Sequence, residues 1–293
     1  MTGRPVVVGV DASDAAMHAV RFAADEARLR SAPLRIVHAV RWPFDRTNEP
    51  WPDVEGAGLL RSGADAVVQA AAESVADLLP ADRITAEVAD GGATAVLLTA
   101  AADAQVLVVG SRGSGGVAGL LLGSTASGVV AHADCPVVVL PDETAALVRD
   151  RRSVVVGVEG HPEDEEVLAF AVAEAIARET DVLAVHAWQD VVLGAAFQSV
   201  GPLVDWAGVL ADEERLLSEA VAGWREKEPD VTVREAVVRD RAARALVAAA
   251  LTAQLLVVGR HVHRTLGSAT HGVVHRATCP VAVVPVGRGG GPR

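Results

Sequence analysis

The residues with the clearest chemical potential form a glycine-rich loop in the first half of the chain. Gly110 and Gly113 follow an apolar run that predicts a strand, and nine further residues lead to Gly123 and Ser124, where a helix is predicted to start. Glycine lets a backbone approach a ligand closely and adopt dihedral angles that a side chain would block. The amides and hydroxyls at a helix start, here of Ser124 and Thr125, favour anions. This spacing predicts a phosphate-binding loop and therefore nucleotide binding.

A carboxylate follows the first predicted strand. Residues 5–10 are a continuous apolar run, which is typical of a parallel strand buried on both faces, and Asp11 comes directly after it. Ligands of open parallel sheets bind beyond the carboxyl ends of the strands, where Asp11 could accept hydrogen bonds from ribose or adenine. The alternative is that Asp11 only caps the next helix. Because the glycine loop is predicted at the same end of the sheet, we favour the interpretation that Asp11 contacts a ligand.

Composition excludes several classes of partner. The 293 residues are 51% hydrophobic, enough for two ordinary cores, and the formal net charge is −12. This charge argues against nucleic acid and anionic membranes as main partners, because both require clustered Lys and Arg. No apolar run reaches the roughly 18 residues that a membrane span needs, and the N-terminus does not read as a signal peptide. We therefore expect a cytoplasmic protein.

The chain repeats itself at a nearly constant spacing. Three matching pairs, with their offsets, are Gly9 and Gly157 at 148, Gly110 and Gly259 at 149, and Cys135 and Cys279 at 144. Such self-similarity indicates two copies of one domain. The late drop in offset places a five-residue deletion inside the second copy of the glycine loop.

The repeat sets the domain boundaries. We expect a first domain at 1–141, a linker at 142–152, a second domain at 153–287 and a frayed tail at 288–293. Each copy alternates strands and helices, starting and ending on a strand, which predicts an open doubly wound α/β sheet.

The elements of the first copy can be placed from its periodicity. Strands are expected at 5–10, 34–40, 84–88, 106–109 and 136–140, and helices at 14–30, 59–79, 93–102 and 124–131. Residues 41–58 are expected to be a long surface loop and a candidate lid. The last strands, 136–140 and 280–285, are apolar runs that should lie at sheet edges, so we expect the two copies to pair through them.

Five separated motifs together resemble the universal stress protein family. They are Val8–Ser13, Val37–Val40, Val109–Gly113, Gly123–Thr125 and Cys135–Val139. The glycines match that family's nucleotide-binding signature, G-x2-G-x9-G-[S/T], and the duplication resembles its tandem-domain members. The resemblance covers essentially the whole chain. It implies two Rossmann-like, open, parallel five-stranded sheets of the adenine nucleotide alpha hydrolase-like type.

The resemblance also implies a ligand and the residues that hold it. The ligand would be ATP, with or without Mg²⁺, or cyclic AMP as in some members. Gly9, Val10 and Asp11 would contact the nucleoside, and the main chain of Ala39 would contact the adenine edge. The phosphates would be held by Gly110, Arg112, Gly113, Gly123, Ser124 and Thr125, although Arg112 could equally be a solvated loop residue.

The second copy departs from this pattern. Glu159 replaces the aspartate, and Val262 stands where the first copy has Gly113. Seven residues separate Gly259 from Gly267, against twelve between the matching glycines of the first copy. We therefore expect the second copy to bind adenine nucleotide weakly or not at all.

Two side-chain types outside the loop could also carry chemistry. His271 and His275 are four residues apart, which suits a metal pair, but no Cys or carboxylate joins them at matching spacing, so we expect no metal. A solvated polar surface or a pH-sensitive contact is favoured instead. Cys135 and Cys279 occupy equivalent positions before a proline, which favours packing over a redox role.

Two classes of function remain open. The first is a nucleotide-dependent regulator of a stress response, and the second is a structural or partner-binding module with a fixed or absent nucleotide. No Walker motif, pyrophosphatase loop or synthetase His-x-Gly-His occurs, so we expect no enzyme, with slow ATP hydrolysis left open. We further expect a homodimer of tandem chains that acts on an unidentified protein partner.

Overall fold

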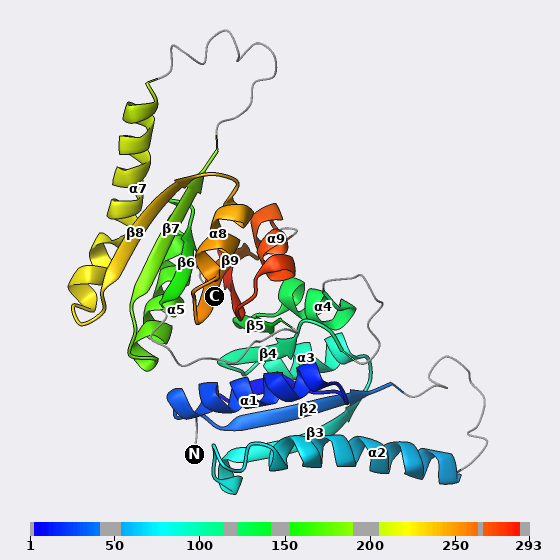
Figure 1. The fold of residues 1–293 in the computed structure, drawn as a ribbon. Helices are drawn as coiled ribbons and strands as arrows, with labels where there is room; N and C mark the ends of the chain where they lie inside the picture. The colour runs from blue at the N-terminus through cyan, green and yellow to red at the C-terminus, as the bar shows by residue number, and fades with distance from the viewer. Residues whose placement is uncertain are drawn as a thin grey trace, which may run out of the picture. The chain divides into compact units, whose positions relative to one another are not determined.

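The computed structural model describes residues 3–41, 54–113, 122–141, 153–189, 205–262 and 266–287. The chain divides into two compact units, Met1–Ala146 (unit 1) and Leu147–Arg293 (unit 2), and Figure 1 shows the course of each. The expected linker at 142–152, the tail at 288–293 and most of the candidate lid, 42–53, lie outside the described residues.

Unit 1 is built on five parallel strands. They are β1 (Val6–Gly9), β2 (Leu34–Val40), β3 (Ile84–Asp90), β4 (Val106–Gly110) and β5 (Val137–Leu140). Their spatial order is β3-β2-β1-β4-β5, with every pair parallel. The central strands are apolar because both faces are covered: Val6, Val7 and Val8 have no exposed surface. The predicted open parallel sheet is confirmed.

Unit 2 repeats the same plan. Its strands are β6 (Val154–Val158), β7 (Val182–Trp188), β8 (Val233–Arg239), β9 (Leu255–His261) and β10 (Val281–Val286). The order is β8-β7-β6-β9-β10, again all parallel. In each unit the order reverses between the first and fourth strands, which is where open α/β sheets bind ligands.

Helices connect the strands as expected for a doubly wound sheet. Unit 1 has α1 (Asp14–Leu29), α2 (Val54–Glu73), a short 3₁₀ turn η1 (Ala81–Arg83), α3 (Ala93–Ala101) and α4 (Ser124–His132). Unit 2 has α5 (Asp164–Ala177), α7 (Trp206–Lys227), α8 (Ala242–Ala250) and α9 (Ser268–Arg276). α3 packs on α4, and α8 packs on α9 in the same way.

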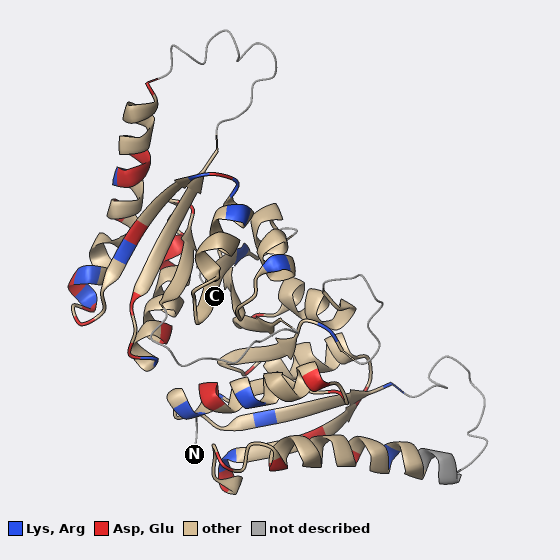
Figure 2. Cartoon of the chain, in the orientation of Figure 1, with Lys and Arg blue, Asp and Glu red and all other residues tan. Residues whose placement is uncertain are grey.

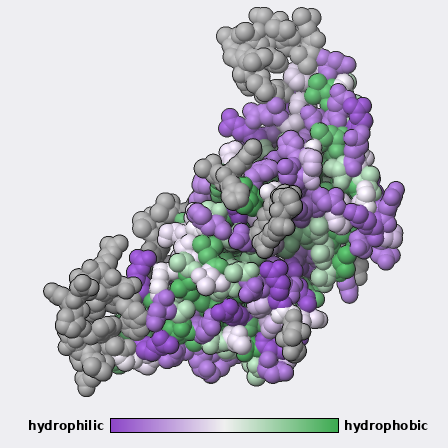
Figure 3. Space-filling view, turned by 180° about the vertical axis from the view of Figure 1, so that it is seen from behind, coloured by the Kyte–Doolittle hydropathy of each residue, from purple (hydrophilic) through white to green (hydrophobic). Residues whose placement is uncertain are grey.

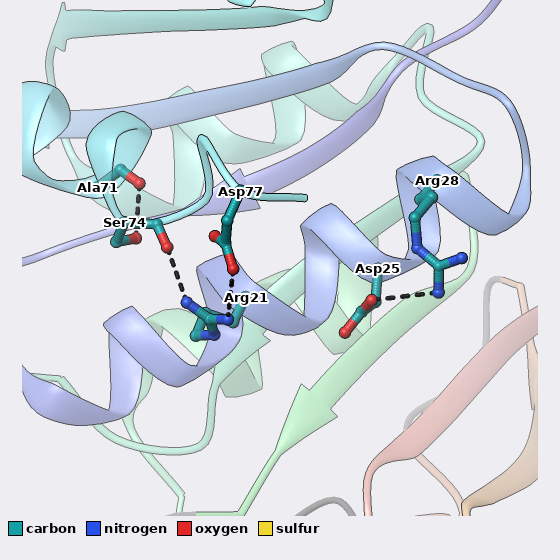
Figure 4. Close-up of polar contacts among 6 residues, drawn as sticks. All are labelled: Arg21, Asp25, Arg28, Ala71, Ser74 and Asp77. Atoms are coloured by element: carbon teal, nitrogen blue, oxygen red, sulfur yellow. Dashed lines mark hydrogen bonds and ion pairs between the residues drawn. The ribbon is translucent and has the colours of Figure 1, made fainter. Parts of the chain in front are cut away.

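The boundaries of α2 differ from the sequence prediction. The helix begins at Val54 rather than at 59, inside the expected loop, and ends at Glu73 rather than at 79. It ends there because the Ser74 hydroxyl bonds the Ala71 carbonyl at 2.7 Å, a local contact that competes with the helix. Arg21 of α1 then holds this turn, donating to the Ser74 carbonyl at 2.8 Å and to Asp77 at 3.3 Å (Figure 4).

β5 and β10 are the last strands in the order of their own units. Edge strands expose unpaired backbone groups unless something covers them. The position of each strand therefore agrees with the sequence expectation, and the pairing of the two copies through these strands stays a prediction.

The surface carries both charge signs and scattered apolar residues. Figure 2 shows acidic and basic residues interspersed along α1 and α7. On the face shown in Figure 3, hydrophobic residues reach the surface in groups separated by hydrophilic ones. No helix among the described residues is long and apolar enough to cross a membrane.

Candidate functional site

A cavity of about 360 Å³ opens at the carboxyl ends of β1, β2 and β4 in unit 1, beside the start of α4. Five separate segments of the sequence contribute its walls. All the site residues predicted from the sequence line it, namely Gly9, Val10, Asp11, Ala39, Gly110, Arg112, Gly113, Gly123, Ser124 and Thr125. The structure therefore brings the predicted nucleoside and phosphate residues into one place.

Asp11 has two roles in this geometry. Its Oδ1 accepts hydrogen bonds from the Ser13 amide at 3.0 Å and from the Ser13 hydroxyl. The Ser13 Oγ in turn accepts from the Ala16 amide at 3.2 Å and caps α1. Ser13 rather than Asp11 is therefore the cap of α1: Asp11 Oδ1 only supports the capping serine, and the residue also lines the cavity.

Gly113 is required for space rather than for its dihedral angles, which corrects the sequence expectation. The glycines with positive φ in the described residues are Gly91, Gly160 and Gly287, and neither Gly110 nor Gly113 is among them. A Cβ on Gly113 would instead overlap the Asp11 carboxylate. A side chain at 113 would therefore force the Asp11 carboxylate to move from its place at the end of β1.

Two backbone hydrogen bonds hold the two ends of the glycine loop together. The Ser111 amide donates to the Leu140 carbonyl at 2.7 Å, and the Gly123 amide donates to the Ser111 carbonyl at 2.7 Å. Gly123 is the N-cap of α4, so Ser124 and Thr125 supply its first turn. Amides in a first turn have no partner within the helix, which leaves them available to an anion. Residues 114–121 lie outside the described part of the chain.

Sequence reasoning missed the residues that complete the walls. The cavity is also lined by Ala16, Val37, His38, Ala93, Leu97, Val109, Ser111 and Ala126. His38 Nδ1 lies 2.7 Å from the Val10 carbonyl, which only accepts, so this nitrogen carries the proton. Leu97 packs under Gly9, where a Cβ would come within 2.7 Å of it. The signal for His38 was present, because the motif around it recurs at His186 in the second copy.

Unit 2 has a cavity at the equivalent place, of about 710 Å³. Glu159, Val262, Gly267 and Ser268 all line it, so the substituted residues and the shortened loop are where the repeat predicts. A cavity is thus present in unit 2 as well, which the sequence did not lead us to expect.

The structure places the histidine pair on α9 and buries both cysteines. The rings of His271 and His275 lie 4.2 Å apart on α9, tilted by 35°. Within the described residues, no group of three or more His, Cys, Asp or Glu side chains could hold a metal ion. Cys135 and Cys279 are buried free thiols. Burial raises the pKa of Cys279 to about 12, so its thiol stays protonated and unreactive.

Acidification should destabilise unit 2 through His275. Partial burial lowers the pKa of His275 below its usual 6.5, and the neighbouring His271 and Arg276 lower it further. Below pH 6.5 the unfolded chain therefore binds a proton that the folded chain resists, and stability falls as pH decreases. His275→Gln should lose less stability than the parent between about pH 7.5 and 5.5, measured by urea unfolding. His18→Gln, on the exposed face of α1, is the control, and equal losses in parent and His275→Gln would contradict the assignment.

Two open parallel sheets, each with a cavity where its strand order reverses, define a tandem α/β protein with one ligand-type site per unit. The chain belongs to the universal stress protein family, whose model matches residues 3–141 and 150–285. The sequence-based identification of a two-copy member is thus confirmed.

Named relatives and a solved structure agree with this assignment. Universal stress protein Rv2623 of Mycobacterium tuberculosis (strain ATCC 25618 / H37Rv) is 36% identical over 292 residues, covering 95% of each chain. Universal stress protein Rv2005c of the same strain is 36% identical over 295 residues, covering 95% of this chain and 96% of its own. The crystal structure of a universal stress protein from Archaeoglobus fulgidus DSM 4304 has a TM-score of 0.70 at 17% identity, covering 98% of this chain and all of its own, and so shares the fold.

Proposed function

We propose that unit 1 binds ATP and that the protein acts as a nucleotide-dependent regulator of a stress response. The observation that carries the proposal is the meeting of four separately predicted segments around one cavity. Its volume of about 360 Å³ lies in the usual range for small-molecule sites. In this proposal the nucleoside lies against Gly9, Val10 and Asp11, with the adenine edge on the main chain of Ala39. The phosphates lie at the glycine loop and the start of α4, with or without Mg²⁺.

We propose binding rather than turnover. The groups in the cavity that could act as a general base are Asp11 and His38. Asp11 Oδ1 is engaged by Ser13, and the protonated Nδ1 of His38 is engaged by the Val10 carbonyl. Because Nδ1 carries the proton, His38 keeps Nε2 as a possible base, so the case against turnover comes from the sequence, in which none of the loops that position ATP for hydrolysis or nucleotidyl transfer occurs. This argument supports a nucleotide that is held and sensed, and slow hydrolysis stays a question for assay.

Titration with ATP tests the proposal directly. The apo protein should bind about one ATP per chain, because unit 1 alone has the complete anion cradle. Isothermal calorimetry gives the stoichiometry, and mass spectrometry of ligand released from purified protein identifies what is bound. Failure to bind any adenine nucleotide would contradict the proposal, and two equal ATP sites per chain would contradict the preference for unit 1.

The alternative functions predict different rates of nucleotide exchange and a different preferred ligand. A regulator must release its nucleotide, whereas a structural module would copurify with a nucleotide that does not exchange against labelled ATP. A cyclic AMP binder would prefer that ligand over ATP in competition. We further propose a cytoplasmic homodimer of tandem chains that acts through a protein partner, which size-exclusion chromatography with light scattering tests at the level of the dimer.

A further inference from the structure

We propose that the cavity of unit 2 binds an adenine nucleoside carrying at most one phosphate and rejects the triphosphate. The inference rests on the proposed function, because it transfers the nucleoside position of unit 1 to unit 2. The sequence predicted weak or no nucleotide binding by unit 2, and we now propose that only the binding of a polyphosphate chain is lost there. The two cavities are similar on the side proposed for the nucleoside and differ on the side proposed for the phosphates.

The nucleoside side keeps most of its residues in unit 2, with Glu159 in place of Asp11 and with His186 also paired through Nε2 to Glu213 at 2.9 Å. Three matching pairs that line the two cavities are Val10 and Val158, Ala39 and Ala187, and Leu97 and Leu246. The histidine contact recurs as well: His186 Nδ1 lies 2.8 Å from the Val158 carbonyl, as His38 Nδ1 lies 2.7 Å from Val10. A pocket with the same residues on the same strands offers a nucleoside the same contacts.

The phosphate side of unit 2 is remodelled by a longer strand. β9 continues through Arg260 and His261, which pair with Pro285 and Val286 of β10. The Val262 amide then donates to the Val286 carbonyl at 2.9 Å. Val262 matches Gly113, so the amide at this position is used by the sheet and a branched side chain stands beside it. Residues 260–262 are therefore paired with β10, where unit 1 has the glycine loop residues 111–113.

The turn after β6 is occupied by a carboxylate of the protein itself. Asp164 Oδ2 accepts from the amides of Glu159, Gly160 and His161 at 3.0, 2.6 and 2.9 Å. Asp164 is buried, with 7% of its surface exposed, and lines the cavity. The matching residue of unit 1 is Ala16, which is uncharged. The amides of this turn therefore cannot serve a ligand anion, and a fixed negative charge stands next to them.

The charges that line the two cavities differ accordingly. Unit 1 has one carboxylate, Asp11, and one guanidinium, Arg112. Unit 2 has three carboxylates and one guanidinium, namely Glu159, Glu163, Asp164 and Arg260. Like charges in a partly enclosed site repel, so a polyphosphate is disfavoured in unit 2. A nucleoside, or one with a single phosphate, avoids most of this repulsion.

Arg260 is the residue that we propose binds the single phosphate of the ligand in unit 2. It is only 6% exposed and lines the cavity at the place where unit 1 has Ser111. Its guanidinium presents paired N–H donors, which suit one phosphate group. The cavity is also large enough for the ligand, at about 710 Å³. In unit 2 we therefore propose that the Arg260 guanidinium contacts one phosphate, where unit 1 is proposed to use the glycine loop.

A matched pair of blocking variants separates the two sites in the full chain. Ala39→Trp fills the nucleoside side of unit 1, and Ala187→Trp fills the same place in unit 2. Each apo variant is titrated with adenosine, AMP and ATP by calorimetry, after circular dichroism confirms folding. We expect Ala39→Trp to lose ATP binding and to keep one AMP site per chain. We expect Ala187→Trp to bind ATP like the parent and to lose that AMP site.

The outcomes distinguish this inference from the proposed function. If Ala39→Trp binds neither adenosine nor AMP, or binds ATP as tightly as AMP, the inference is overturned while ATP binding by unit 1 stands. If the parent binds no ATP but Ala39→Trp binds AMP, the proposed function fails and the inference stands. Arg260→Gln provides a milder test. It should weaken AMP binding in the Ala39→Trp background about tenfold or more and leave adenosine binding unchanged, because the proposed charge-assisted contact involves the phosphate, which adenosine lacks. Equal effects on both ligands would overturn the role of the single phosphate.

Discussion

Gly113→Val is expected to abolish ATP binding and leave the chain folded. A Cβ at this position would overlap the Asp11 carboxylate, and the branched side chain would also stand where the phosphates are proposed to lie. Gly113 comes after β4 rather than within it, so folding should lose little. Calorimetric titration with ATP measures the loss, and thermal unfolding checks the fold.

Two further variants make this test specific. Asp11→Ala should weaken ATP binding by only about 1–2 kcal/mol, as for a lost hydrogen bond. Gly63→Ala on α2 is the control, since its Cβ would meet nothing within 4 Å, and it should bind ATP like the parent. If Gly113→Val also binds ATP like the parent, the phosphates do not lie at this loop.

Arg178→Ala should give the largest loss of stability, about 3–5 kcal/mol in the free energy of unfolding. Arg178 forms an ion pair with Glu174 one turn earlier on the same chain, and the two side chains are only 9% and 3% exposed. Removing the guanidinium takes away one partner of a carboxylate that is only 3% exposed, which is more costly than the pair itself is stabilising. Chemical denaturation of the full chain measures the change in unit 2.

The control for this prediction is a solvent-exposed ion pair within another helix of unit 2. Arg215 pairs with Asp212 on α7, and their side chains are 68% and 69% exposed. Arg215→Ala should therefore change stability by only about 0–1 kcal/mol. The double variant Glu174→Leu with Arg178→Met should recover most of the loss, because it removes both buried charges. A loss below 1 kcal/mol in Arg178→Ala would show that Glu174 is relieved by another route.

Much of the fold followed from local patterns. Valine-rich runs such as Val6–Gly9 predict strands covered on both faces, and the repeat carries each element into the second copy. The bounds of α2 did not follow, because they depend on a contact that periodicity does not report. The Ser74 hydroxyl bonds a carbonyl of its own helix, and Arg21 from α1 then holds the turn.

Some features of the candidate site could also be predicted from the sequence, and others could not. The spacing of the glycines from Gly110 to Gly123 predicts an anion loop, since short-range backbone geometry makes such a loop. The reason for glycine at 113 lies more than a hundred residues away in Asp11, so only the folded sheet reveals it. The same holds for Leu97, which closes the cavity beneath Gly9.

The sequence by itself determined the family and the two-copy plan, and it predicted residues that the structure brings to one cavity of unit 1, because these depend on residue types at fixed spacing. The tertiary structure decided what the altered second copy became. Loop shortening alone predicts loss of function, but the length of β9 and the place of the Asp164 carboxylate depend on pairing and packing between distant segments. Those long-range contacts left an open cavity with a different charge around Arg260.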